Sequence, residues 1–388
     1  MDSNIGGKQE GFNDRVWEGG GVFTFVCAVY FVILLLFVAL RVSAFFLSEH
    51  MSRQGLEIFF TVTSQILIMT VIPFAAMFYY KRKQAKTRAK LGDFSYLTNS
   101  KGTGGEIKSI GASFGFNRPS GRVIAYAFLL GLLIYFFNIF VAGFFNGILS
   151  LLGYRFPGMG AETFSGVGGL FITLFFIAVL PGVCEEVTHR GFLLGGFIKR
   201  LGVMRAVFFT SLLFGFMHLN IVQFFYAAIL GYIIALAVLA TRSLWVGIIM
   251  HFMNNGVGTY FSFASRNGWP GGNFLQDLIM AFAGAGLLVF VLLVGLIAFA
   301  IMKIIHMFAR ENFLKGRIEE YERTGEQGQV FMRPGMTWLG KMKAYLEYDF
   351  NGNSTRRQKL NAKEATLFYG IIFLGSIITI FTLVWGFL

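Results

Sequence analysis

The sequence has few charged residues, two cysteines and six prolines. Charged residues make up 14% of the 388 positions, whereas soluble domains average about 25%. Together with 55% hydrophobic residues, this excludes an ordinary soluble domain and indicates a protein with several membrane-spanning helices. Cys27 and Cys184 both lie in apolar stretches without a pairing pattern, which argues against a disulfide scaffold and against a zinc knuckle.

The apolar residues gather into nine segments near the length of about 20 residues that a transmembrane helix requires. These segments lie near residues 21–47, 57–80, 122–152, 166–188, 206–219, 221–241, 243–263, 274–303 and 365–388. The polar stretch before the first segment lacks the pattern of a cleaved signal peptide, so the first segment is expected to stay as an anchor. The sequence therefore predicts an all-α polytopic bundle of about nine transmembrane helices.

The distribution of Lys and Arg predicts the orientation of this bundle, because cytoplasmic loops of membrane proteins are enriched in both. The segment 81–122 holds ten Lys and Arg against two acidic residues. With this segment inside, the expected loops 189–205 and 303–364 also fall inside and the N-terminus is cytoplasmic. We predict an integral protein of a cell membrane, of bacterial type. Anionic lipids at the cytoplasmic face account for the net charge of +13, and no nucleic-acid partner is expected.

The order of the segments divides the chain into four parts. We expect an N-terminal two-span region with a basic loop (1–120), a core (121–303), a cytoplasmic polar insertion (304–364) and a C-terminal transmembrane helix (365–388). Within the insertion, "RENFLKGRIEEYER" is typical of a mixed-charge helix and "GMTWLGKMKAYLEY" of an interfacial helix. The insertion contains no residue pattern that indicates chemistry.

Polar side chains recur inside three neighbouring apolar segments, where a charged group costs at least ~2.5–3.5 kcal/mol. The clearest case is "PGVCEEVTHRGF", residues 181–192. At a rise of ~1.5 Å per residue, the polar residues of the three segments come to one level, about 14–21 Å from the cytoplasmic edge. They are Glu185, His218, His251 and Asn255. Their common depth indicates a functional site inside the membrane.

Local spacing separates the two neighbouring carboxylates. Glu186 and Arg190 stand at i,i+4 on one helical face, where a buried ion pair offsets much of the cost of desolvation. We predict that this pair supports the structure. Glu185 is turned ~100° away from the pair, so its carboxylate is free to face another helix.

The remaining polar residues suit the hydrolysis of an amide. Glu185 and His218 can hold and deprotonate a water molecule. His251 and Asn255, on one face at i,i+4, can stabilise the oxyanion that develops. Two other interpretations stay open at this point: a divalent metal held by His218, His251 and Glu185, and a proton path in a transporter.

Three motifs in this order resemble those of the CPBP family of intramembrane proteases, which includes the CAAX prenyl endopeptidases and bacteriocin-processing enzymes. They read "EEVTHR" (185–190), "FGFMH" (214–218) and "HFMNN" (251–255), and the resemblance covers about residues 120–263. It implies a helical endopeptidase with an intramembrane cavity open to the cytoplasm. His189 within the first motif, and the insertion 304–364 with the span after it, depart from the usual pattern.

The resemblance implies the same site roles as the spacing. Glu185 and His218 activate water, and His251 and Asn255 form the oxyanion hole. The family is often labelled as metalloproteases, but we predict a glutamate-dependent enzyme without a cofactor, zinc being the alternative. The expected partner is a membrane-associated peptide or protein substrate. The rival interpretations are a non-catalytic scaffold or bacteriocin-immunity protein of the same fold and a proton-coupled transporter, although no internal repeat favours the latter.

Overall fold

The computed structural model describes residues 21–90, 111–155, 164–324, 335–348 and 359–385. In this part of the chain every regular element is a helix and none is a strand, so the predicted all-α fold is confirmed. The elements, with η for π-helical stretches, are α1 (Val22–Leu47), α2 (Arg53–Val62), η2 (Thr63–Val71), α3 (Ile72–Lys90), α5 (Gly121–Leu151), α6 (Gly166–Leu174), η3 (Phe175–Val179), α7 (Leu180–Glu186), η4 (Val187–Leu194), α8 (Gly195–Leu201), α9 (Val203–Met217), α10 (Ile221–Thr241), α11 (Leu244–Asn267), α12 (Phe274–Ala285), α13 (Leu287–Thr324), α14 (Trp338–Tyr348) and α15 (Ala362–Trp385).

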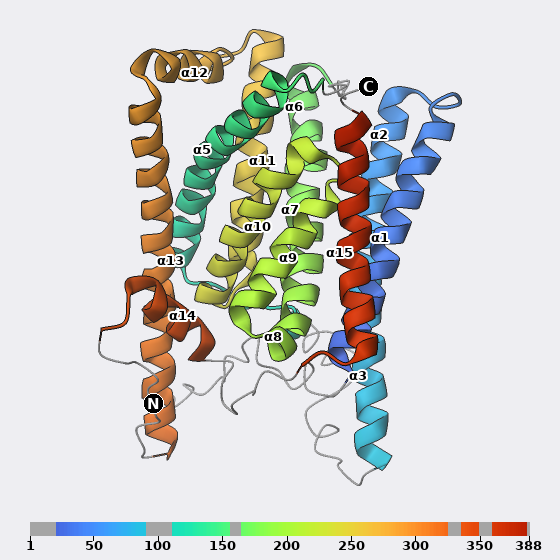
Figure 1. Ribbon diagram of the computed structural model, residues 1–388, viewed down its shortest axis with the longest axis vertical. Helices are drawn as coiled ribbons and strands as arrows, with labels where there is room; N and C mark the ends of the chain where they lie inside the picture. The colour runs from blue at the N-terminus through green and yellow to red at the C-terminus, as the bar shows by residue number, and fades with distance from the viewer. Residues whose placement is uncertain (1–20, 91–110, 156–163, 325–334, 349–358, 386–388) are drawn as a thin grey trace.

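Most of these helices run side by side along the long axis of the molecule (Figure 1). We name the two ends of the bundle by the elements that lie there. The α12 end carries α12, which lies across the axis, and the start of α6. The α8 end carries the turn between α8 and α9 and the start of α5.

Seven helical stretches in the described part of the chain are long and apolar enough to cross a membrane. They are Val22–Ala44, Gln54–Thr87, Gly121–Leu151, Gly166–Leu201, Ile221–Thr241, Leu288–Ile318 and Ala362–Val384. Each corresponds to one of the nine predicted segments. The other two predicted segments are also helical, but α9 has only 15 residues and the polar residues of α11 lower its hydropathy.

The predicted loop 189–205 is wrong. The fourth span continues through η4 and α8 as far as Leu201, and the chain turns only at Gly202, which has a φ of +78°. Arg190, which the loop prediction counted as a cytoplasmic charge, is 2% exposed inside the bundle. A paired arginine can lie at this depth because its partner offsets the cost of removing it from water.

The predicted span 274–303 is interrupted. Gly286, with a φ of +83°, separates α12 from α13, and the membrane-crossing stretch begins at Leu288. The apolar run is continuous in sequence, so hydropathy alone gave no sign of the break. A glycine adopts this left-handed conformation without the steric cost that a side chain would bring.

Two helices of the polar insertion are confirmed. The mixed-charge segment continues α13 to Thr324, and the predicted interfacial helix is α14. The two pack through aromatic rings, since His306 stacks on Trp338 with centroids 4.8 Å apart and Phe313 lies 5.0 Å from Tyr345. Residues 325–334 and 349–358 of the insertion lie outside the described residues.

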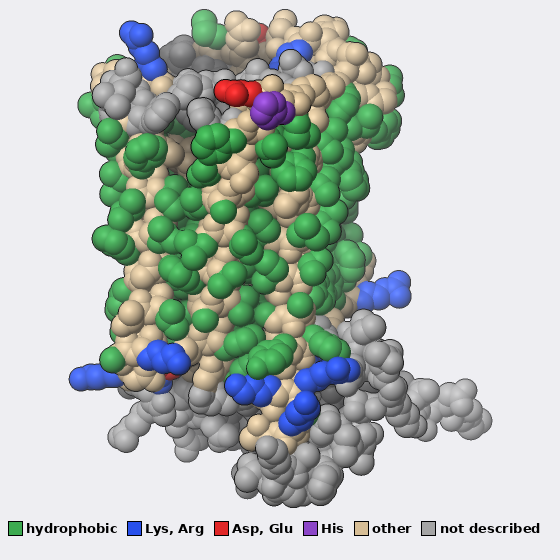
Figure 2. Space-filling view, turned by 90° about the vertical axis from the view of Figure 1, so that its right-hand side faces the viewer, with side chains coloured by type: hydrophobic (Ala, Val, Ile, Leu, Met, Phe, Trp, Pro, Cys, Tyr) green, Lys and Arg blue, Asp and Glu red, His purple; other side chains and the backbone are tan. Residues whose placement is uncertain are grey.

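The surface has the pattern expected of a protein embedded in a membrane. Figure 2 shows hydrophobic side chains over the middle of one face, with Lys and Arg gathered mainly at the α8 end. On α13 the apolar stretch is only 11% buried inside the protein. Such an exposed apolar surface requires lipid to cover it. The chain is therefore an integral membrane protein.

Candidate active site

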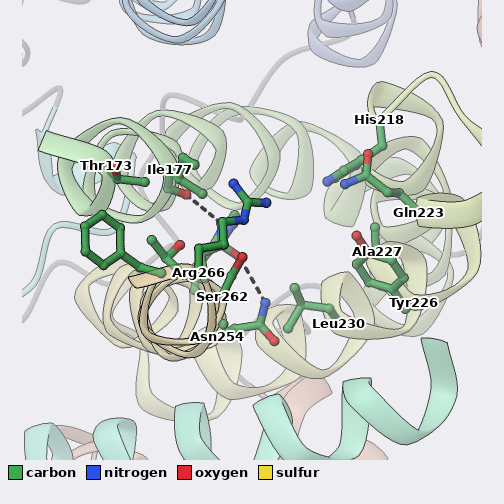
Figure 3. Close-up of a pocket in the computed structure, with 15 residues that line it drawn as sticks. Thr173, Ile177, His218, Gln223, Tyr226, Ala227, Leu230, Asn254, Ser262 and Arg266 are labelled. Carbon is green, nitrogen blue, oxygen red and sulfur yellow. Dashed lines mark hydrogen bonds between the residues drawn. The ribbon is translucent and has the colours of Figure 1, made fainter. Parts of the chain in front are cut away.

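A cavity of about 380 Å³ lies between helices α6, η3, α9, α10 and α11. Polar side chains face it from the three predicted segments in which the sequence analysis found polar residues, 166–188, 206–219 and 243–263 (Figure 3). Its lining consists of Thr173, Ile177, His218, Gln223, Tyr226, Ala227, Leu230, His251, Asn254, Asn255, Gly258, Thr259, Ser262, Phe263 and Arg266. No Asp, Glu or Lys contributes to this lining.

The longest polar wall of the cavity is one face of α11. His251, Asn255, Thr259, Ser262 and Arg266 follow at intervals of four, four, three and four residues. At 100° per residue these positions stay within a narrow sector of the helix, so they form one stripe along its axis. The stripe begins at the buried His251 and ends at the exposed Arg266.

Behind the cavity lies a fully buried ionic network. Arg190 donates through Nη1 to Glu186 Oε1 at 2.6 Å and through Nη2 to the carbonyl of Gly231 at 3.0 Å. The guanidinium also lies 4.6 Å from the centroid of the Phe214 ring. The ion pair predicted from the i,i+4 spacing is thus present, with Glu186 0% and Arg190 2% exposed.

The same carboxylate holds the imidazole of His251. His251 Nδ1 lies 2.9 Å from Glu186 Oε1, and a carboxylate can only accept, so Nδ1 is assigned the proton. Gly247 allows this approach, because a Cβ there would lie 2.9 Å from Glu186 Oε2. The sequence analysis missed this contact, since nothing in the spacing links residues 65 positions apart.

Glu185 differs from its neighbour in both exposure and bonding. Its side chain is 14% exposed, and Oε2 lies 4.0 Å from His251 Nε2, beyond hydrogen-bonding distance. Its Oε1 accepts a hydrogen bond of 2.9 Å from Gln65 Nε2 on η2. Among the described residues no donor reaches Oε2. One oxygen is therefore fixed and the other is left for a reactant.

Gln65 is a site residue that the sequence analysis missed. It is 7% exposed and comes from the second span, 120 positions before Glu185. The only signal was a polar amide inside the apolar run "TVTSQILIMTV". The π-helix that carries it contacts the π-helix after Glu186, because Thr188 Oγ1 donates to the carbonyl of Met69. Short π-helical stretches of this kind occur frequently at functional sites.

His218 ends α9 and points into the cavity (Figure 3). Its Nδ1 lies 2.9 Å from the carbonyl of Phe214, which can only accept, so Nε2 is assigned the lone pair. The chain turns at Leu219, with a φ of +51°, and Asn220 then caps α10 by accepting from the Gln223 amide at 2.8 Å. This sharp turn places the imidazole at the end of a helix, within the cavity wall.

Asn255 is held by two neighbours. Its Nδ2 donates to the carbonyl of Ile177 at 3.1 Å, and its Oδ1 accepts from Asn254 Nδ2 at 2.9 Å. Asn254 in turn accepts from Asn138 Nδ2 at 3.0 Å. An amide NH₂ has two hydrogens, so one N–H of Asn255 remains for a ligand in the cavity.

The predicted site residues therefore come together in part. His218, His251 and Asn255 line one cavity, whereas Glu185 is not part of the lining and has its Oε2 4.0 Å from His251 Nε2. In the part of the chain that the structure describes, no group of three or more His, Cys, Asp or Glu side chains is arranged to hold a metal ion. The alternative zinc set of His218, His251 and Glu185 thus does not fit this arrangement, and no step is derived through a metal.

Comparison with known proteins finds a family model that is similar to the segment holding this site. Residues 167–257 match the family model described as type II CAAX prenyl endopeptidase Rce1-like. The match covers less than a quarter of the chain and contains all three motifs. No curated protein and no solved structure matches the chain. The predicted resemblance is confirmed for this segment, whereas Gln65 and the polar insertion lie outside it.

Proposed function

We propose that the chain is an intramembrane endopeptidase, because residues 167–257 match the Rce1-like family model. It hydrolyses a peptide bond of a membrane-associated peptide or protein, with Glu185 as the base that activates water. At the family level, the match supports a CAAX-type intramembrane protease. The observation that carries the finer proposal is the unequal setting of two adjacent carboxylates. Glu186 is fully buried and its Oε1 is committed to Arg190 and His251, whereas Glu185 is partly exposed and its Oε2 accepts no hydrogen bond from a described residue.

The first step is the attack of water on the scissile carbonyl. Glu185 Oε2 takes a proton from the water while the water oxygen forms a bond to the carbonyl carbon. His218, with an Nε2 lone pair in the cavity, accepts the second hydrogen bond of that water. The electron pair of the carbonyl moves to its oxygen and creates an oxyanion. When this intermediate collapses, the C–N bond breaks and the proton held by Glu185 passes to the leaving nitrogen.

The oxyanion lies against α11 in this proposal. Asn255 supplies the N–H that is not bonded to Ile177. His251 has its Nδ1 proton committed to Glu186, so Nε2 donates only when the ring carries a second proton. Carboxylate oxygens lie 2.9 Å from its Nδ1 and 4.0 Å from its Nε2. Donors fixed in a low-dielectric site act on the charge as it develops, without reorganising.

No cofactor is required by this scheme. We expect elemental analysis of the active, purified protein to find no stoichiometric zinc, and we expect activity to survive prolonged dialysis against a chelator. One tightly held zinc per active chain, with activity lost on its removal and restored on its return, would contradict this proposal.

Reconstituted protein tests the function directly. A library of membrane-anchored peptides, analysed by mass spectrometry after incubation with the wild type and with Glu185→Gln, should contain products formed only by the wild type. A scaffold or immunity protein would give no product with either chain. A transporter would instead move protons or a solute across proteoliposomes in a manner that Glu185→Gln abolishes.

The membrane setting is part of the proposal. The basic segment 81–122 supports a cytoplasmic N-terminus and contact with anionic lipids, in a bacterial cell membrane. Flotation with vesicles cannot test the lipid contact in an integral protein, so we propose measuring thermal stability in nanodiscs with and without anionic lipid. A higher melting temperature with anionic lipid is the expected result, and equal temperatures would contradict the lipid contact.

A further inference from the structure

The cavity lies in one half of the bundle only. Along α11 its lining begins at His251 and continues to Arg266, and none of residues 244–250 contributes. This is the half of α11 nearest the α12 end, where the helix finishes at Asn267 (Figure 1). The buried Glu186–Arg190 network lies behind the inner end of the cavity.

The other walls agree with α11. On α10, which runs the opposite way, the lining residues fall between Gln223 and Leu230, within the first half of the helix. On α6 and η3 they are Thr173 and Ile177, near the start of the fourth span. From α9 only His218, the residue at which the helix ends, belongs to the lining. Because α10 and α11 run antiparallel, the first half of α10 and the second half of α11 lie at the same end of the bundle. The cavity therefore lies toward the α12 end.

Exposure rises toward the α12 end. His251 is 2% exposed, whereas Ser262 and Arg266 farther along the stripe are exposed. In the other direction, Glu186 is 0% and Arg190 2% exposed, and η4 is buried throughout. Packed side chains therefore close the α8 side of the site, and the exposed part of its wall lies toward the α12 end.

The basic residues mark the opposite end. Several lie in the second half of α3, the last turn of α8, the first turns of α5 and α9, and the turn before α11. They include Arg82, Arg122, Lys199, Arg205 and Arg242. Figure 2 shows Lys and Arg concentrated there on the face in view. Cytoplasmic ends of membrane proteins carry this excess.

From these two placements we infer that the cavity opens away from the cytoplasm, and that its substrate is a peptide segment on the extracytoplasmic side of the membrane. That the entering molecule is a substrate rests on the proposed function, whereas the direction in which the cavity opens does not. This direction is opposite to the cytoplasmic opening that the family resemblance implies. The resemblance concerns the motifs, whereas the direction follows from lining residues and charges of this chain.

The depth of the site sets a requirement on the substrate. Fifteen residues separate His251 from Arg266, about 22 Å along the helix axis. An extended chain rises about 3.3 Å per residue, so about six or seven unfolded residues are needed to bring a scissile bond to Glu185. Arg266 is the one charged side chain of the described lining, so the entering segment is expected to be neutral or acidic.

Thiol labelling tests the direction without any assay of activity. Ser262→Cys places a thiol on the exposed part of the cavity wall, and Arg205→Cys places its matched control at the α8 end. A membrane-impermeant maleimide would be applied to right-side-out and to inverted vesicles, with the wild type as background for the buried Cys27 and Cys184. Ser262→Cys should be labelled in right-side-out vesicles only, and Arg205→Cys in inverted vesicles only.

Each other result overturns the inference in a distinct way. Labelling of both thiols from one side would show that the cavity and the basic end share a face. Labelling of Ser262→Cys only in inverted vesicles, with Arg205→Cys labelled only in right-side-out vesicles, would show that the whole chain has the reverse orientation. None of these results depends on peptide cleavage, so the proposed endopeptidase activity stands or fails separately in the product analysis of Glu185→Gln.

Discussion

The two sides of the His251 imidazole offer contrasting environments. On its Nδ1 side, Glu186 and Arg190 are almost completely excluded from solvent and bonded to each other and to fixed groups. On its Nε2 side, Glu185 is partly exposed and has an oxygen that no described donor reaches. Two carboxylates that are neighbours in sequence thus face unlike surroundings. Each carboxylate has one oxygen without a hydrogen bond among the described residues, so the contrast teaches that burial beside a fixed cation, rather than the number of bonded oxygens, separates a supporting charge from a reactive one.

The strongest test of this contrast removes the charge of Glu185. Glu185→Gln keeps the shape of the side chain but cannot take a proton from water, so we expect a loss of at least ~10²–10⁴-fold in kcat/KM. The melting temperature should stay close to that of the wild type, since the side chain is partly exposed. Glu364→Gln is the control, because this carboxylate pairs with Arg200 far from the site. A fully active Glu185→Gln would remove the residue from the mechanism.

The matching change at Glu186 should act on stability first. Glu186→Gln leaves Arg190 without its charged partner inside the bundle, and breaking a buried pair costs roughly 3–5 kcal/mol. Thermal denaturation in one detergent would compare it with Glu185→Gln. A Glu186→Gln protein that melts like the wild type yet has no activity, beside an active Glu185→Gln, would reverse the two assignments.

A smaller effect is expected on the oxyanion side. Asn255→Ala removes one donor, and loss of such a donor lowers the rate by ~10²–10³-fold. The loss should appear in kcat with little change in KM, because the oxyanion exists only during the reaction. Ser262→Ala, in the same polar stripe, serves as the control for a change in the cavity wall. An increase in KM with unchanged kcat would instead assign Asn255 to substrate binding.

The smallest effect concerns the residue that fixes Glu185. Gln65→Ala deletes one hydrogen bond to a charged group, an interaction of about 1.5–3 kcal/mol, so a decrease in kcat of about tenfold or more is expected. Ser64→Ala is the matched control, since Ser64 is also buried in the same span but donates to the carbonyl of Thr61. Equal activities for both variants would show that Gln65 does not position the base.

The sequence predicted features that repeat along a helix and missed those that depend on contacts between helices. The Glu186–Arg190 pair follows from i,i+4 spacing, and it is present. The third member of the network, His251, comes from another helix and has no signal in the spacing. Gln65 is more remote still, because a lone amide in an apolar span forms no motif.

The errors in the fold have a related cause. Arg190 was counted toward a cytoplasmic loop because the rule for loop charges considers how many Lys and Arg are present, and not whether each is paired. The predicted span 274–303 includes Gly286, because hydropathy is averaged over a window of many residues and does not detect a break at one glycine. Apolar length predicts that a helix exists. Its ends depend on pairing and on backbone conformation.

The π-helical stretches carry one more consequence. A π-helix closes its hydrogen bonds over five residues rather than four, so it accommodates an extra residue compared with α-helical winding. Deleting one residue from η4, such as Leu193, would let the segment rewind as an α-helix, and α8 would keep nearly the same direction relative to Glu186, because the removed residue is the one that the wider winding accommodates. Within η4, however, each side chain would change its direction relative to Glu186, and Arg190 is among them. A deletion at this point should therefore disturb the buried Glu186–Arg190 pair first, and the packing of α8 much less.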